Sequence, residues 1–232
     1  MRRFFATAFL LVPLVLAAAC TTLPRLDPAP PERAAALARS CDALFPVGKW
    51  RLIHTIRASL RGDRQSVMTG VAVIDSDARS IHSVMMTVEG LVVLDAVYAD
   101  GRLTLNRGVP PFDAESFARG MMADIRLLFF KPEGKPETVG TTEDGKPACR
   151  YDAGPDRTVF IAVDPETGDW TLRQYRGRRL ARTVKARVED PSTAGADAPV
   201  PKRLTLTAHG FPRPYTLNMT LLKGERIPGD TE

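Results

Sequence analysis

The sequence lacks most of the motifs that mark common enzymes and metal sites. It contains only three histidines and three cysteines, without a Cys-x-x-Cys pair, so no group of residues has the spacing of a metal site. Gly-x-Ser-x-Gly, His-Glu-x-x-His and Gly-x-Gly-x-x-Gly are absent as well, which removes the commonest hydrolase, metalloprotease and dinucleotide-binding signatures. We therefore expect no metal and no cofactor.

Strong clustering of charge is also missing. The formal net charge is +5, but Lys and Arg never form a run longer than two, so a nucleic-acid partner is not expected. The 232 residues are 44% hydrophobic and 25% charged, which is the balance of an ordinary globular protein. This length suits a single domain with one core.

Residues 1–19 have the pattern of a cleaved signal peptide. Two arginines precede an apolar stretch from Phe4 to Leu16, and three alanines then lead to Cys20. The stretch is shorter than the roughly 20 residues that span a bilayer, and small residues mark a cleavage point. The segment ending at Cys20 resembles the lipobox of bacterial lipoproteins, although Ala17 stands where Leu is usual. This resemblance implies acyl chains such as palmitate on Cys20; the alternative is an ordinary signal with an incidental cysteine.

The segment 20–33 follows the predicted lipidation site. It contains four prolines and no apolar periodicity, which predicts an extended tether. The tether is followed by a single domain at 34–232. In lipoproteins of this kind, Thr21 after the acylated cysteine implies delivery to the outer membrane. We therefore expect a lipid-anchored protein of the bacterial outer membrane that faces the periplasm.

The two remaining cysteines form an even pair. Free thiols seldom persist in an oxidising compartment, so Cys41 and Cys149 are predicted to form a disulfide. The three histidines, His54, His82 and His209, are isolated from one another in the sequence. We expect them to be strand residues rather than metal ligands.

Most of the chain alternates between apolar and polar residues, which predicts half-buried strands of an antiparallel sheet. The first is 50–60, and Asp100-Gly101 is a strong hairpin signal. The other predicted strands are 66–74, 80–88, 91–98, 103–106, 148–151, 158–163, 170–175, 180–188, 203–207 and 215–222. Residues 190–201 are rich in Pro, Ala and Gly and are predicted to be a loop.

Two segments have helical character. The first is 32–41, and the second is capped by Asp113 and ends at Lys131-Pro132. Apolar residues recur through the second segment at helical spacing, so this helix must bury one face against the sheet. The predicted fold class is therefore α+β, with a helix covering a curved antiparallel sheet.

Two polar motifs are open to more than one interpretation. Residues 140–146 match most of a phosphate-binding loop, but Pro147 occupies the place of the magnesium-binding Ser or Thr, so a hairpin turn is predicted. Asp124, with Arg126 nearby, lies among the apolar residues of the second helix. It is either a solvated or ion-paired structural residue or, less in keeping with its setting, an acid or base.

Methionines recur on the predicted strands and on the second helix. Methionine adapts to ligands of irregular shape, and a helix laid across a curved sheet can leave an apolar cleft. Core packing is the alternative role for these residues. The predicted lining of the cleft is Trp50, Met68, Met86, Leu94, Met121, Ile125 and Phe129.

Several stretches resemble a family of bacterial lipoproteins of unknown function that belongs with the LolA and LolB lipoprotein-carrier superfamily. They are 91–105, 122–130, 200–206 and 215–219. The resemblance implies a half-open antiparallel barrel whose hydrophobic concave face is covered by helices and accepts acyl chains. Membrane-anchored members deliver cargo with an exposed leucine, a place that Leu91 would take here.

Three classes of function follow from these observations. The first is a non-catalytic, monomeric lipoprotein that binds an acyl chain, a lipid or an acylated protein and transfers it to the membrane. The second is a structural or assembly lipoprotein that holds a protein partner in the cell envelope. The third is an enzyme acting on envelope lipids or glycans, for which Asp124, His54 and His82 offer little support.

Overall fold

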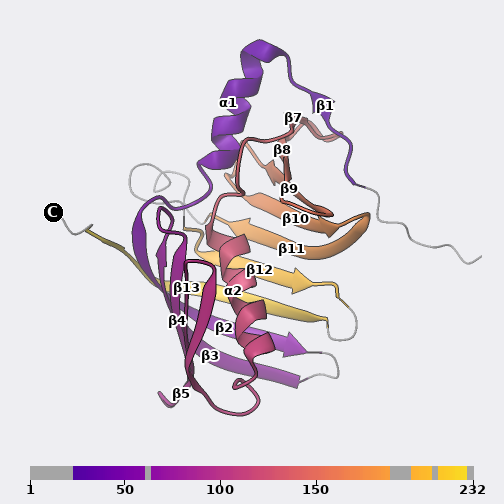
Figure 1. The fold of residues 1–232 in the computed structure, drawn as a ribbon. Coiled ribbons are helices and arrows are strands. Elements are labelled where there is room, and N and C mark those ends of the chain that lie inside the picture. The colour runs from indigo at the N-terminus through magenta and orange to yellow at the C-terminus, as the bar shows by residue number, and fades with distance from the viewer. Residues whose placement is uncertain (1–22, 61–63, 189–199, 211–213, 229–232) are drawn as a thin grey trace, which may run out of the picture.

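The computed structural model describes residues 23–60, 64–188, 200–210 and 214–228. The predicted signal peptide, Cys20 and most of the predicted loop at 190–201 lie outside these residues. The described chain folds into one large antiparallel sheet and two helices (Figure 1). The α+β class is thus confirmed. Neither helix within these ranges has the length and apolar character needed to cross a membrane.

The sheet is open, with β1 at one edge and β6 at the other. Its order is β1-β7-β8-β9-β10-β11-β12-β13-β2-β3-β4-β5-β6, and every neighbouring pair is antiparallel. The strands of the first half are β1 (Asp27–Pro28), β2 (Lys49–Leu60), β3 (Arg64–Asp75), β4 (Ser80–Thr87), β5 (Val92–Ala99) and β6 (Arg102–Gly108). Those of the second half are β7 (Thr138–Thr141), β8 (Pro147–Asp152), β9 (Arg157–Val163), β10 (Trp170–Arg176), β11 (Arg179–Arg187), β12 (Arg203–Ala208) and β13 (Tyr215–Ile227).

Each predicted strand has a counterpart in the sheet because alternation of apolar and polar residues is a local property. In β2, for example, Trp50, Leu52 and His54 are buried while Arg51 between them is exposed. One face of the sheet therefore carries the core, which forms a single large cluster with the buried side of α2.

The helix α2 (Glu115–Phe129) follows β6 and precedes β7 in the chain. It lies across one face of the sheet (Figure 1). The prediction that Asp113 caps it is wrong: the cap residue is Ala114, and no side chain caps the helix. The backbone of Asp113 is instead packed against β6, where a Cβ on Gly108 would lie 2.5 Å from the Asp113 Cα.

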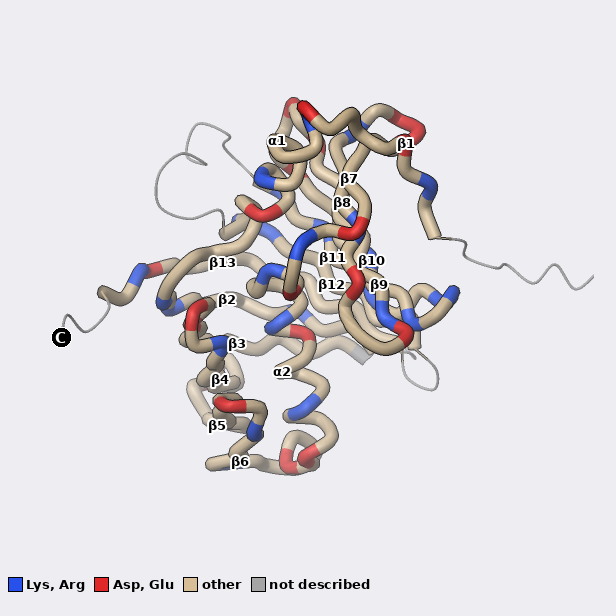
Figure 2. Tube along the Cα trace, turned by 45° about the horizontal axis from the view of Figure 1, so that its top comes forward, with Lys and Arg blue, Asp and Glu red and all other residues tan. Residues whose placement is uncertain are grey.

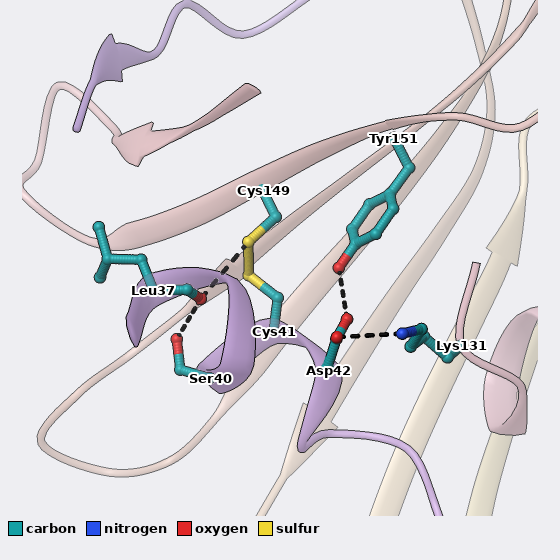
Figure 3. Close-up of a disulfide and its surroundings, with 7 residues drawn as sticks. All are labelled: Leu37, Ser40, Cys41, Asp42, Lys131, Cys149 and Tyr151. Carbon is teal, nitrogen blue, oxygen red and sulfur yellow. Dashed lines mark hydrogen bonds and ion pairs between the residues drawn. A yellow bond between two sulfur atoms is a disulfide. The ribbon is translucent and has the colours of Figure 1, made fainter. Parts of the chain in front are cut away.

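The helix α1 (Pro31–Asp42) is attached to the sheet by a disulfide between Cys41 and Cys149 of β8 (Figure 3). Both cysteines are fully buried. Asp42 extends the attachment: its carboxylate accepts hydrogen bonds from the Tyr151 hydroxyl and the Lys131 ammonium, each at 3.0 Å. Burial, with Asp42 close by, raises the pKa of Tyr151, so this hydroxyl remains a donor.

The second part of the predicted tether is not free of the domain. Residues 27 and 28 form β1, which pairs with β7, and a side chain on Gly140 would collide with the carbonyl of Asp27. Leu23 and Leu26 pack against a small cluster formed by Ala148, Phe160 and Tyr175 on the sheet. Neither β1 nor β7 was predicted, because two-residue and four-residue strands are too short to show alternation.

Candidate ligand-binding pocket

A pocket of about 640 Å³ lies between the second half of α2 and the adjoining ends of β9, β10 and β11. Its apolar wall on the helix side includes Leu127 and Phe130, and its wall on the sheet side includes Val159 and Leu172. Ligand pockets commonly have volumes of roughly 300 to 1,000 Å³. The pocket therefore has room for part of a lipid-sized molecule.

A buried ionic group forms one end of this pocket. Asp124 of α2 is 5% exposed, and its Oδ1 accepts a hydrogen bond from Nε of Arg182 at 2.8 Å. Its other carboxylate oxygen accepts the hydroxyl of Tyr215, whose ring lies 5.8 Å below the Arg182 guanidinium. Burial, followed by the effect of Asp124, raises the pKa of Tyr215. The group joins α2 to β11 and β13.

Of the two roles predicted for Asp124, the structure agrees with that of an ion-paired structural residue, but its partner is Arg182. The sequence pointed to Arg126, which instead contacts Tyr98, with its Nη1 3.2 Å from the hydroxyl and its guanidinium over the ring. Residues two apart on a helix do not face each other. Both carboxylate oxygens of Asp124 are bonded to neighbours, so the residue is placed to hold the helix.

Basic side chains outnumber acidic ones around the pocket: seven Lys or Arg residues line it and three Asp or Glu residues do. Figure 2 shows basic positions beside the labels of β9 and β10. Arg79 and Arg126 both pair with Glu133, at 3.1 and 3.7 Å. His209 is also in the lining, and burial, followed by the nearby Arg182, lowers its pKa. The pocket thus combines apolar walls with an excess of positively charged side chains.

None of the seven residues predicted to line an apolar cleft lines this pocket. Four of them, Trp50, Leu94, Ile125 and Phe129, are buried in the main core. Met68 and Met121 are half-buried and pack against the same core. Met86 is half-buried on β4. The apolar side of α2 contacts the sheet directly, so the space in which the prediction placed a cleft is filled by side chains.

The residues that do line the pocket were missed because half of them are polar or charged. The strongest sequence signal available was the run Arg176-Gly177-Arg178-Arg179, which places several arginines around one hairpin turn. The longest run of adjacent Lys and Arg residues does not reveal such a cluster, because Arg157 is brought beside Arg176 by the pairing of β9 with β10.

Leu91 lies in the turn between β4 and β5 and is 53% exposed. Val88 in the same turn is 66% exposed. Two large apolar side chains thus project into solvent from one hairpin. This turn is the predicted place for a membrane-delivery leucine.

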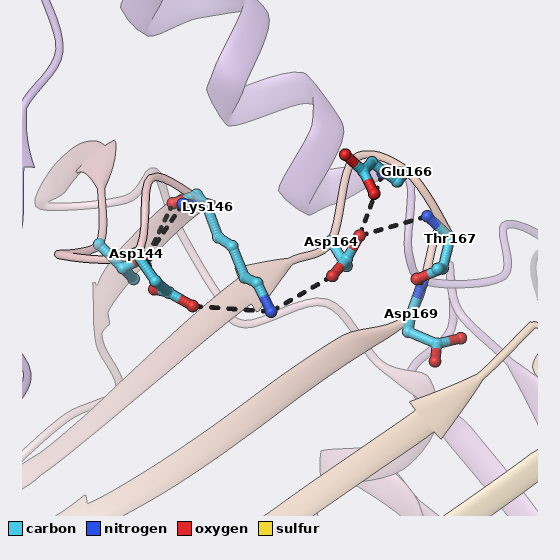
Figure 4. Close-up of polar contacts among 7 residues, drawn as sticks. Asp144, Lys146, Asp164, Glu166, Thr167 and Asp169 are labelled. Atoms are coloured by element: carbon cyan, nitrogen blue, oxygen red, sulfur yellow. Dashed lines mark hydrogen bonds and ion pairs between the residues drawn. The ribbon is translucent and has the colours of Figure 1, made fainter.

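The segment that resembles a phosphate-binding loop is the turn of the β7–β8 hairpin, as predicted. The backbone N–H of Thr142 donates to the carbonyl of Lys146 at 2.9 Å. The Lys146 ammonium lies 3.2 Å from Asp164 and 3.6 Å from Asp144 (Figure 4). These carboxylates, Asp164 foremost, raise the lysine pKa. The lysine binds two acids of its own chain rather than facing a phosphate cradle.

The three histidines lie in separate places. His82 of β4 lies 3.0 Å from Asp95 of β5, and His209 lies 2.9 Å from the Thr183 hydroxyl. The prediction that His209 is a strand residue is wrong, because β12 ends at Ala208. His54 of β2 is buried beside Phe129, with ring centroids 5.7 Å apart. Within the ranges that the structure describes, no group of three or more His, Cys, Asp or Glu side chains could hold a metal ion.

Comparison with known proteins shows a fold similar to that of a solved structure. No protein-family model matches the chain, and no curated protein matches it. The structure is similar to that of a LolA superfamily protein from Nitrosomonas europaea, with a TM-score of 0.55 and 10% sequence identity. The match covers 84% of this chain and 94% of the other. The predicted resemblance to the LolA and LolB superfamily is therefore confirmed at the level of the fold.

Proposed function

We propose that this protein is a non-catalytic carrier lipoprotein of the bacterial outer membrane. In this proposal Cys20 carries the acyl chains that anchor it, and the domain faces the periplasm. It binds a hydrophobic ligand, such as an acyl chain, a lipid or an acylated protein, and transfers it to the membrane. The sheet acts as a half-open barrel with α2 over its concave face. The observation that carries the proposal is the pocket between α2 and the sheet of a LolA-like fold.

The pocket walls suit a ligand that must be both held and released. Leu127 of α2, Phe130 directly after the helix and Leu172 of β10 all line the pocket, and burying each CH₂ group of a chain contributes about 0.8 kcal/mol. Ala123, which also lines the pocket, is exposed to solvent. We propose that a ligand enters and leaves at this exposed edge of the pocket.

The β4–β5 turn supplies a second element of the proposal. A carrier that passes cargo to a bilayer needs an apolar contact with the membrane surface. Leu91 and Val88 project from this turn, and no other role for two exposed apolar side chains is evident in the hairpin. We assign them to membrane contact during transfer.

The test is analysis of co-purified lipid. The full chain is expressed in a bacterial host, purified in the neutral detergent dodecyl maltoside, and examined by native mass spectrometry and by organic extraction. We expect bound lipid or acyl species in addition to the anchor. The variant Ala123→Trp should lose this material, because a large side chain there occupies the pocket.

The matched control is Ser116→Trp, an exposed position on the same helix outside the pocket. It should retain the bound material. Equal retention by both variants would contradict the pocket as the binding site. An unaltered chain that carries no lipid would instead favour an assembly lipoprotein that binds a protein partner.

A further inference from the structure

Three arginines stand side by side at the end of the pocket. In the register of the sheet, Arg176 of β10 pairs with Arg157 of β9 on one side and with Arg179 of β11 on the other. All three are exposed and line the pocket. We refer to Arg157, Arg176 and Arg179 as the arginine row. Like charges placed opposite each other on neighbouring strands are destabilising, so this row is costly unless an anion lies against it.

The acids of the pocket do not compensate the arginine row, because each is already bonded elsewhere. Asp124 binds Arg182 and Tyr215. Glu133 pairs with Arg79 and Arg126.

The third acid, Asp152, accepts the backbone N–H of Gly154 at 3.0 Å. Among the residues that the structure describes, no acidic side chain forms an ion pair with any member of the row. The positive charge of the row is therefore available to a ligand.

Apolar surface continues directly from the arginine row. Side chains two apart on a strand project from the same face, so Val159 lies on the same face of β9 as Arg157. Across the pocket, Leu127 of α2 completes this apolar part. A molecule with an anionic end and an apolar chain would match both parts at once.

We propose that the ligand of this pocket is a lipid with an anionic phosphate head group, which the arginine row binds while the acyl chain lies between α2 and the sheet. This inference rests on the proposed carrier function and narrows its ligand class. Arginine suits such a group because its planar guanidinium can make paired hydrogen bonds to phosphate oxygens.

The test compares two lipids that differ in head-group charge. The full chain in dodecyl maltoside micelles is mixed with dioleoyl phosphatidylglycerol, which has an anionic phosphate head group, or with dioleoyl glycerol, which has the same acyl chains but neither phosphate nor charge. Native mass spectrometry measures the bound fraction of each. We expect phosphatidylglycerol to bind about tenfold more tightly, since charge-assisted hydrogen bonds contribute on that scale.

The variant Arg157→Gln/Arg176→Gln/Arg179→Gln should bind the two lipids equally and should unfold at the same temperature as the unaltered chain or at a higher one. Its matched control also removes three exposed arginines, all outside the pocket. That control is Arg102→Gln/Arg107→Gln/Arg187→Gln. It should keep the preference for phosphatidylglycerol; loss of the preference in the control would overturn the assignment to the row.

The remaining outcomes separate this inference from the function on which it rests. If the unaltered chain binds both lipids equally, the head-group assignment is overturned and the carrier function stands. If it binds neither, both are overturned. If inorganic phosphate raises the unfolding temperature only when the row is intact and no lipid binds, the row is a site for free anions and the lipid assignment is wrong.

Discussion

Asp124 in α2 and Arg182 in β11 form an ion pair of 2.8 Å although 58 residues separate them in the chain. The Asp124 side chain is 8% exposed and the Arg182 side chain 24%. This pair, together with Tyr215, joins the helix to the middle of the sheet beside the pocket. Its partners come from three elements, so its loss should affect both the packing of α2 and the shape of the pocket.

Removal of one partner of this pair should be costly. Asp124→Ala leaves Arg182 and Tyr215 without their acceptor, and we expect it to lower the free energy of unfolding by about 3 kcal/mol. The double variant Asp124→Ala/Arg182→Ala should lose less than the sum of the two single variants, because no unpaired charge remains. Urea unfolding of the four proteins measures both quantities.

The control for this cycle is the exposed pair Glu115 and Arg119 on the same helix. Glu115→Ala should cost no more than about 0.5 kcal/mol, as solvent screens exposed pairs. Additive losses at Asp124 and Arg182 would show that the two residues do not depend on each other.

The disulfide should contribute much of the stability of the domain. Cys41 and Cys149 are 108 residues apart, and a crosslink that closes a loop of this length stabilises by about 4 to 5 kcal/mol in the chain-entropy treatment. We expect Cys41→Ala/Cys149→Ala to lower the free energy of unfolding by an amount of this order in guanidinium titrations. Cys20→Ala, at the predicted lipidation site, should leave it unchanged. Equal midpoints for all three chains would contradict the prediction.

Stability should decline on acidification because of His54. Burial lowers the pKa of His54 to about 4, against 6.5 for an ordinary histidine. Its Nε2 has no hydrogen-bond partner within the described chain. As the pH falls below 6.5, His54 becomes protonated in the unfolded chain but stays neutral in the folded protein. The native state therefore loses stability until the pH reaches about 4.

The expected loss between pH 7 and pH 5 from this residue is about 2 kcal/mol. His54→Leu should remove that component, so the variant's free energy of unfolding should depend less on pH over this interval. Thermal or urea unfolding at the two pH values checks the difference. An unchanged difference would place the acid sensitivity in other residues.

Delivery to a membrane should depend on Leu91. In Leu91→Glu, a charged side chain replaces the apolar one that we assign to membrane contact, and we expect transfer of a bound fluorescent acyl probe to phosphatidylcholine vesicles to slow about tenfold. Binding of the probe should not change, because Leu91 does not line the pocket.

The matched control for delivery is Leu222→Glu, which changes a leucine of β13 that is 58% exposed. It should transfer the probe at the rate of the unaltered chain. Slowing of both variants to the same extent would point to a general effect of negative charge at the protein surface.

The sequence by itself determined the elements and their class. Alternation of apolar and polar residues, turn residues and helical spacing are local properties, so α2 and most of the longer strands were predicted close to their observed bounds. The exception is β13, which was predicted to end at residue 222 and extends to Ile227. The two-residue β1 was missed because its pairing with β7 depends on Gly140, far along the chain. The hairpin at 140–146 was recognised because Pro147 is adjacent to it in the sequence.

Only the tertiary structure decided which residues meet. Asp124 has Arg182 as its partner because the packing of α2 brings β11 to it, which residue spacing within the helix does not encode. The residues predicted to line a cleft fill the core, since α2 lies directly on the sheet. The arginine row exists only through the register of β9, β10 and β11. Local patterns specify elements, whereas a site is formed by contacts between different elements.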